Sequence, residues 1–209
     1  MNSTGARALI DVLLEQGVDT VFGYPGSAVL DIYDELYKCD KIRHILTCHE
    51  QAAAHAADGY ARATGKTGVV IATSGPGATN LVTGIAAAYM DSSPVVAITG
   101  NVKTSLLGSD SFQEVDIAGV TMPVTKYSFI ASGERGVTQD VREAFSIAQS
   151  GRKGPVLVDI PADIAAQSEE YERAPKSEPA RAKEPEETQL ARAAQMIAKA
   201  KRPLIYVGG

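Results

Sequence analysis

LTCHEQAAAHAADGYARATGK, the stretch from Leu46 to Lys66, marks the passage from an apolar strand to an alanine-rich helix. Glu50 stands at the start of that helix. A carboxylate there lies at the positive end of the helix dipole, and open α/β sheets bind their ligands at the edge where the strands end. The stretch therefore predicts an α/β fold with Glu50 as a candidate site residue.

Strand-like and helix-like segments alternate on both sides of this stretch. Apolar residues at helical spacing predict helices over 4–16, 27–38, 50–64, 78–90 and 138–149. Short apolar runs bounded by turn residues predict strands over 20–22, 42–47, 68–73, 94–100, 125–130 and 155–160. Such alternation is typical of an open, mostly parallel six-stranded sheet with helices on both faces.

The composition changes after the last predicted strand. Residues 167–188 carry three prolines and dense charges of both signs, which predicts an exposed linker. A helix over about 189–200 and an apolar strand over 204–209 follow. We expect one domain over 1–166, a linker over 167–188, and the truncated start of a second α/β domain over 189–209. On this interpretation the chain is a piece of a longer protein.

The overall composition excludes several classes of protein. The 209 residues carry a formal net charge of -5, whereas nucleic-acid binding needs a basic surface. No apolar run approaches the roughly 20 residues of a membrane span, and the first residues lack the basic region and cleavage site of a signal peptide. We expect a cytoplasmic protein without nucleic-acid or membrane partners.

The two cysteines, Cys39 and Cys48, form neither a CxxC unit nor a disulfide framework. We expect both to be reduced structural thiols, with Cys48 buried near the end of a strand.

Three apparent motifs fail on inspection. Gly65 to Thr67 ends like a phosphate-binding loop, but Tyr60 stands where that loop needs glycine. His49-Glu50 opens like a zinc-protease motif, yet position 53 is Ala53. Gly75 to Asn80 begins like a dinucleotide fingerprint, but asparagine replaces its last glycine. No metal ligands are expected in this chain.

Two glycine-containing turns flank the Glu50 segment, FGYPGSA (22–28) before it and TSGPGATNL (73–81) after it. Glycine lets the backbone approach a ligand closely, and each turn precedes a predicted helix. Taken alone, each could be an ordinary structural turn. Glu50 could likewise only complement its helix dipole, which stabilises a helix by roughly 0.3–1 kcal/mol. Phe112 and Gln113 lie in a polar segment without strand or helix pattern, where Phe112 could simply anchor an exposed loop.

The order of these segments resembles one family along essentially the whole chain. The words that carry the resemblance are GARALIDVLLEQGVDTVFGYPG, HEQAAAHAADGYARATGKTGV, IATSGPGATNLVTG, PVVAITG, FQEVDIAG and GPVLVDIP. They resemble the pyrimidine-binding domain of thiamine diphosphate enzymes, and within them the catalytic subunit of acetohydroxyacid synthase (acetolactate synthase).

The resemblance implies a thiamine diphosphate-dependent transferase of branched-chain amino acid biosynthesis. It would condense two pyruvates, or pyruvate and 2-oxobutyrate, with loss of CO2. Glu50 would activate the cofactor through the pyrimidine ring, and Phe112 and Gln113 would approach the substrate from a neighbouring subunit. The residues that would line the cofactor are Tyr24, Pro25, Gly26, Ser27, Ala28, Glu50, Thr73, Pro76, Gly77 and Asn80.

The resemblance also implies partners outside this chain. In the family a GDG…N segment of a C-terminal domain holds the diphosphate and Mg2+, and this chain has no GDG. The family pattern includes FAD, a homodimer or homotetramer, and in some members a small regulatory subunit. We therefore expect the isolated chain to be inactive.

The chain departs from the family pattern at three positions. Ser27 replaces glycine, Asn101 replaces glutamine, and Ala162 replaces a lysine near the substrate and flavin channel. The last change leaves flavin dependence open. Two alternatives remain: another thiamine diphosphate-dependent 2-oxo acid decarboxylase or carboligase, and a non-catalytic pyrimidine-domain module.

Overall fold

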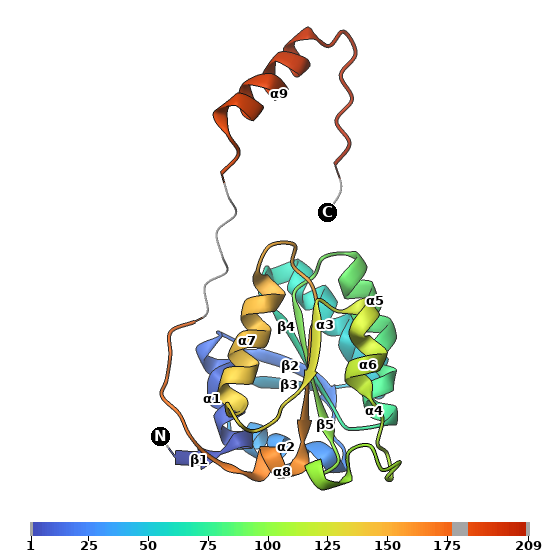
Figure 1. The fold of residues 1–209 in the computed structure, drawn as a ribbon, viewed down its shortest axis with the longest axis vertical. Coiled ribbons are helices and arrows are strands. Elements are labelled where there is room, and N and C mark those ends of the chain that lie inside the picture. Colours follow the sequence, from blue (N-terminus) through green and yellow to red (C-terminus); the bar gives the residue numbers. More distant parts are fainter. Residues whose placement is uncertain (1, 177–183, 208–209) are drawn as a thin grey trace. The chain divides into compact units, whose positions relative to one another are not determined.

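The computed structural model describes residues 2–176 and 184–207, and the chain divides into two compact units, 1–179 and 180–209. Six parallel strands form the central sheet of the first unit, in the order β3-β2-β4-β5-β7-β6 (Figure 1). In chain order these strands are β2 (Thr20–Tyr24), β3 (Arg43–Leu46), β4 (Gly68–Ala72), β5 (Val95–Asn101), β6 (Tyr127–Ile130) and β7 (Val156–Pro161). The predicted six-stranded parallel sheet is confirmed.

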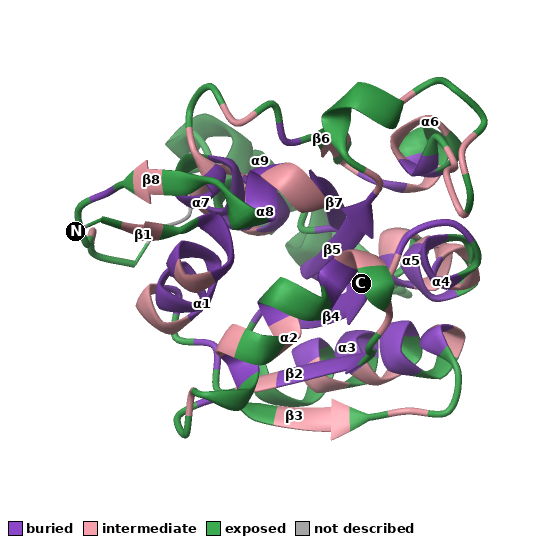
Figure 2. Ribbon diagram, turned by 90° about the horizontal axis from the view of Figure 1, so that it is seen from below, coloured by how far each residue is buried: buried purple, intermediate pink, exposed green. Residues whose placement is uncertain are grey.

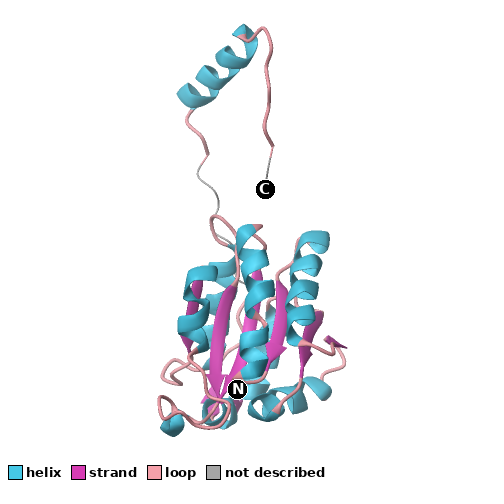
Figure 3. Cartoon of the chain, turned by 90° about the vertical axis from the view of Figure 1, so that its right-hand side faces the viewer, coloured by secondary structure: helices cyan, strands magenta, loops and turns pink. Residues whose placement is uncertain are grey.

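Helices cover both faces of this sheet (Figure 3). One face is covered by α1 (Gly5–Glu15), α2 (Leu30–Tyr37), α7 (Val137–Gln149) and α8 (Ala162–Ala166). The other is covered by α3 (Glu50–Thr64), α4 (Pro76–Asn80), α5 (Val82–Met90) and α6 (Ile117–Thr121). Short 3-10 turns, η1 (Ser27–Val29), η2 (Thr104–Leu106) and η3 (Met122–Val124), lie in the connections.

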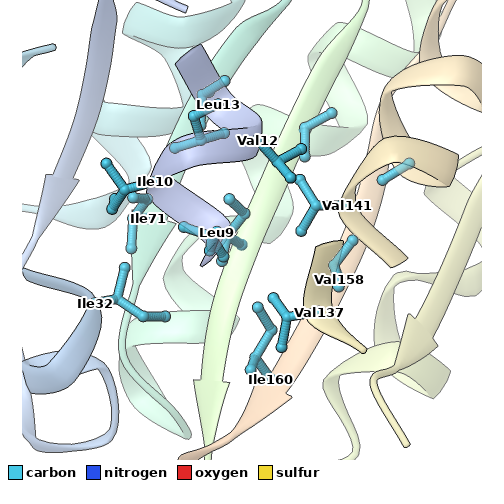
Figure 4. Close-up of a cluster of buried hydrophobic side chains, with 14 of the residues drawn as sticks. Leu9, Ile10, Val12, Leu13, Ile32, Ile71, Val137, Val141, Val158 and Ile160 are labelled. Carbon is cyan, nitrogen blue, oxygen red and sulfur yellow. The ribbon is translucent and has the colours of Figure 1, made fainter. Parts of the chain in front are cut away.

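Strand residues alternate between two hydrophobic cores. Val69 and Ile71 pack with the first group of helices, whereas Val70 and Ala72 pack with the second. Figure 4 shows the first core, in which Leu9, Leu13 and Val141 come together with strand residues. All four residues of β4 named here are fully buried, as expected for a strand covered on both sides (Figure 2).

A small second sheet was not predicted. β1 (Asn2–Thr4) pairs antiparallel with β8 (Ser168–Glu170), and Tyr171 beside it is only 6% exposed. The Glu169 carboxylate accepts hydrogen bonds from the backbone N–H groups of Val137 and Thr138, at the start of α7. The start of the predicted linker is therefore packed against the domain, because Tyr171 and Glu169 serve its core and a helix terminus.

The second unit contains α9 (Glu187–Lys199), close to the predicted helix. Residues 204–207 form no strand, contrary to the prediction, and positions 208–209 lie outside the described residues. Among the described residues, no helix is both long and apolar enough to span a bilayer.

Both cysteines are free thiols, with Cys39 half-buried and Cys48 exposed. The predicted burial of Cys48 is wrong. Cys48 follows β3, which lies at the edge of the sheet, so no further strand covers the segment that leaves it.

Candidate active site

The candidate site lies where the strand order of the sheet reverses. From β2 the chain passes outward to β3, then returns across β2 to β4 on its other side. Connections that leave neighbouring strands in opposite directions open a crevice at the carboxyl ends of those strands, and ligands of α/β proteins bind there. The turns after β2 and β4 are the two glycine-containing turns that the sequence singled out.

Glu50 is the first residue of α3 and is 9% exposed. The His49 side chain caps the helix, because its Nδ1 accepts a hydrogen bond from Gln51 N at 3.1 Å. Glu50 Oε2 accepts a hydrogen bond from Asn80 Nδ2 at 2.9 Å. Within the described residues, Glu50 Oε1 has no hydrogen-bond partner. One carboxylate oxygen is thus fixed by the protein, and the other is available to a ligand.

Glycine leaves the space around this carboxylate open. A β-carbon on Gly77 would lie 3.3 Å from Glu50 Oε1 and 2.7 Å from Thr73 Cγ2, and one on Gly26 would lie 2.5 Å from Thr73 Cβ. Thr73 also joins the two turns, since its Oγ1 accepts a hydrogen bond from Ala28 N at 3.3 Å. Side chains larger than hydrogen at positions 26 and 77 would therefore displace Thr73 or fill the space beside the carboxylate.

Tyr33 of α2 forms part of the surroundings of Glu50 that the sequence did not indicate. Its hydroxyl donates to Ile71 O at 3.1 Å, and its ring meets His44 edge to face at a centroid distance of 5.0 Å. Burial, with a smaller contribution from the negative charge of Glu50, raises the pKa of Tyr33. Tyr33 is therefore a neutral hydrogen-bond donor at neutral pH. Its apolar helical spacing indicated only a core residue.

The remaining predicted cofactor residues form the rim. Tyr24, Pro25, Ser27 and Pro76 are exposed or half-buried, and Pro76 begins α4. The structure thus brings Gly26, Ala28, Glu50, Thr73, Gly77 and Asn80 together and places the other four around them.

The two predicted substrate residues differ in their settings. Gln113 has a positive φ of 58°, and a β-carbon on Gly75 would lie 2.6 Å from its carbonyl oxygen, so its backbone packs directly on the second turn. Phe112 is 85% exposed and makes no contact with Glu50 that would place it in this half of the site. Within the described residues, no group of three His, Cys, Asp or Glu side chains is arranged to hold a metal ion.

A buried carboxylate with one free oxygen can share a proton with a ring nitrogen of a ligand. Glycine at positions 26 and 77 provides the flat space that a ring requires, and the backbone around it is pinned by Thr73. The arrangement is suited to holding a heterocycle and changing its protonation.

Comparison with known proteins agrees with this geometry. Residues 3–120 match the thiamine pyrophosphate enzyme, N-terminal TPP binding domain. The chain is 53% identical to acetolactate synthase from Arthrospira platensis, 52% identical to the acetolactate synthase large subunit from Corynebacterium glutamicum, and 51% identical to the large subunit of acetolactate synthase isozyme 3 from Escherichia coli K12. Each comparison covers 99% of this chain, which spans 33–37% of the length of these relatives. The chain therefore belongs to the thiamine pyrophosphate enzymes, as an N-terminal TPP-binding domain similar to that of acetolactate synthase large subunits.

Proposed function

We propose that this chain is the N-terminal part of a thiamine diphosphate-dependent acetolactate synthase. The whole enzyme condenses two pyruvates, or pyruvate and 2-oxobutyrate, with loss of CO2, for branched-chain amino acid synthesis. The observation that carries this proposal is Glu50, held by Asn80 at one oxygen and open at the other, within a chain about half identical to acetolactate synthase large subunits.

The residues present fit the aminopyrimidine ring of the cofactor. Gly26 and Gly77 leave space that a β-carbon would fill, and the free Oε1 of Glu50 borders that space. Thiamine diphosphate, when bound, supplies the electron sink that lets a 2-oxo acid lose its carboxylate. Glu50 holds and returns a proton at Oε1, while Asn80 fixes Oε2 so that the carboxylate cannot rotate away. Burial strengthens this hydrogen bond because water does not compete for it.

In this proposal the other cofactor-lining residues shape the ring site: Tyr24, Pro25, Ser27, Ala28, Thr73 and Pro76. Gln113 and Phe112 contact the substrate, Phe112 from a position that a second subunit completes. The high exposure of Phe112 in the single chain supports this role. Domain boundaries after residues 166 and 188 belong to the same proposal.

The proposal extends to groups beyond this chain. Mg2+ and the diphosphate are held by a C-terminal domain, FAD binds to the full-length protein, and the enzyme works in the cytoplasm as a homodimer or homotetramer, with a small regulatory subunit as a further partner. The named relatives are large subunits, which supports a smaller partner chain.

The test is an assay of the gene product that carries this chain, purified and supplied with pyruvate, thiamine diphosphate and Mg2+. We expect acetolactate and CO2 in equal amounts. Turnover of other 2-oxo acids without acetolactate would identify a different thiamine diphosphate enzyme. A product that binds no thiamine diphosphate would identify a non-catalytic module.

A further inference from the structure

Asp159 is a fully buried carboxylate in the middle of the sheet. It lies in β7 opposite Thr99 of β5, and both residues are 0% exposed. Thr99 Oγ1 donates to Asp159 Oδ1 at 2.6 Å, and Asn101 Nδ2 donates to Asp159 Oδ2. Across residues 2–176 and 184–207, Asp159 forms no ion pair. Burial of a carboxylate without a cation is costly, and natural proteins break such rules mainly at functional sites.

Asn101 connects this carboxylate to the next segment of the chain. It is the last residue of β5 and is 2% exposed. Because Asp159 accepts from its Nδ2, its Oδ1 faces the other way, where it accepts from Val102 N at 2.7 Å. Val102 opens the loop of residues 102–116, which carries Phe112 and Gln113.

A second aspartate holds the same loop close to its start. Asp163, at the beginning of α8, accepts from Thr104 N at 2.9 Å and from Thr104 Oγ1 at 2.6 Å. Asp159 and Asp163 lie in one continuous segment, β7 followed directly by α8. The start of the loop is thus attached to that segment by hydrogen bonds at two successive points.

The far end of the loop is held against the cofactor side of the site. Glu114 accepts hydrogen bonds from the N–H groups of Gly108 and Ser111, and the backbone of Gln113 packs on Gly75. The loop is therefore a closed unit between two supports. A shift at its start changes where Gln113 lies relative to the turn after β4.

We propose that Asp159 and Asp163 are positioning residues for the loop 102–116, Asp159 through Asn101 and Asp163 through Thr104. They set the binding of the 2-oxo acid substrate by Phe112 and Gln113. This inference rests on the proposed synthase function for its effect on substrate, but the anchoring of the loop is independent of that function.

The principal variant is Asn101→Ala in the intact gene product, with Thr99→Val as its matched control. Both remove one hydrogen bond to Asp159, but only Asn101→Ala also releases Val102. We expect the KM for pyruvate to rise roughly 10- to 100-fold in Asn101→Ala, since small misplacements of substrate-positioning groups have effects of this size. The concentration of thiamine diphosphate needed for half activation stays at the wild-type value in both variants, and the KM stays within about twofold in Thr99→Val.

Asp163→Ala supplies a second variant near the surface, whose loss does not open the core, and Asp34→Ala serves as its control. Asp34 is a surface carboxylate paired with Lys38 of its own helix. We expect Asp163→Ala to raise the KM for pyruvate and Asp34→Ala to leave it unchanged. This pair decides the question even if Asn101→Ala does not fold.

Amide hydrogen exchange of the same intact proteins provides a readout that does not depend on activity. We expect faster exchange over residues 102–116 in Asn101→Ala and Asp163→Ala, with β2 and β4 unchanged. Exchange at the wild-type rate in the loop would overturn the anchoring. Faster exchange with an unchanged KM would overturn the effect on substrate, as would an equal rise of KM in Asn101→Ala and Thr99→Val. A wild-type protein without synthase activity would instead contradict the proposed function and leave the exchange result to decide the anchoring.

Discussion

Replacing Asp159 by asparagine should change how the stability of this chain depends on pH. The side chains have nearly the same shape, and asparagine can keep both contacts: its oxygen accepts from Asn101, and its amide donates to the Thr99 hydroxyl, which can also accept. What the substitution removes is the ionisation of a buried carboxyl. The pKa of Asp159 is raised to about 7, chiefly by burial and further by the negative charge of Asp116.

The magnitude follows from the difference between the folded and unfolded chain. An unfolded aspartate has a pKa near 3.9, so between about pH 4 and pH 7 the folded chain holds one proton more than the unfolded chain. The stabilisation from this proton is complete below about pH 4 and is lost as the pH rises through 7. Each pH unit in this window lowers the free energy of unfolding by about 1.4 kcal/mol, or about 3 kcal/mol between pH 5 and pH 8.

Urea denaturation of wild type and Asp159→Asn at pH 5, 6, 7 and 8, at constant ionic strength, measures this difference. Other titrating groups contribute equally to both proteins and cancel. We expect Asp159→Asn to gain about 3 kcal/mol relative to wild type from pH 5 to pH 8, with an unchanged denaturant slope. Asp34→Asn at the surface provides the control, with a much smaller change. Parallel curves for wild type and Asp159→Asn would refute the reasoning.

Two glycine substitutions test the geometry of the site. Gly77→Ala places a β-carbon 2.7 Å from Thr73 and 3.3 Å from the free oxygen of the carboxylate, so we expect weaker thiamine diphosphate activation of the intact gene product. Gly59→Ala, in the exposed part of α3 with no atom within 4 Å of the new β-carbon, should leave activation unchanged and stabilise the helix by up to about 1 kcal/mol. Gly75→Ala combines a positive φ of 57° with a collision against the backbone of Gln113, whereas Gly151→Ala has a φ of 55° and open space. Thermal denaturation should show a larger loss for Gly75→Ala than for Gly151→Ala, by more than about 1 kcal/mol; equal losses would mean that the collision is relieved at no cost.

Sequence patterns predicted the large elements well because those elements depend on neighbouring residues. The helix that starts at Glu50 begins and ends where alanine content, His49 and Gly65 indicate, since capping and composition act over a few positions. The six strands were visible as short apolar runs bounded by turns. Their parallel arrangement followed from the helices between them.

Features that depend on distant residues were not visible in the same way. β1 and β8 are three polar residues each and form only because they meet across the length of the domain. Asp159 gave no signal as a special residue, because its partners lie about 60 positions away in β5. The strand expected over 204–207 is absent, and a strand requires a neighbour to which it can hydrogen-bond.

The central claim is that Glu50 activates thiamine diphosphate through a hydrogen bond from its free oxygen. The most direct measurement is the rate at which the C2 hydrogen of bound thiamine diphosphate exchanges with deuterium, by rapid quenching and proton NMR. Wild type and Glu50→Gln of the intact gene product are compared at saturating cofactor and Mg2+. The account predicts that Glu50→Gln still binds the cofactor but slows exchange by roughly 10²- to 10⁴-fold, the usual contribution of a positioned acid–base group. Exchange at the wild-type rate in Glu50→Gln would contradict the role of Glu50.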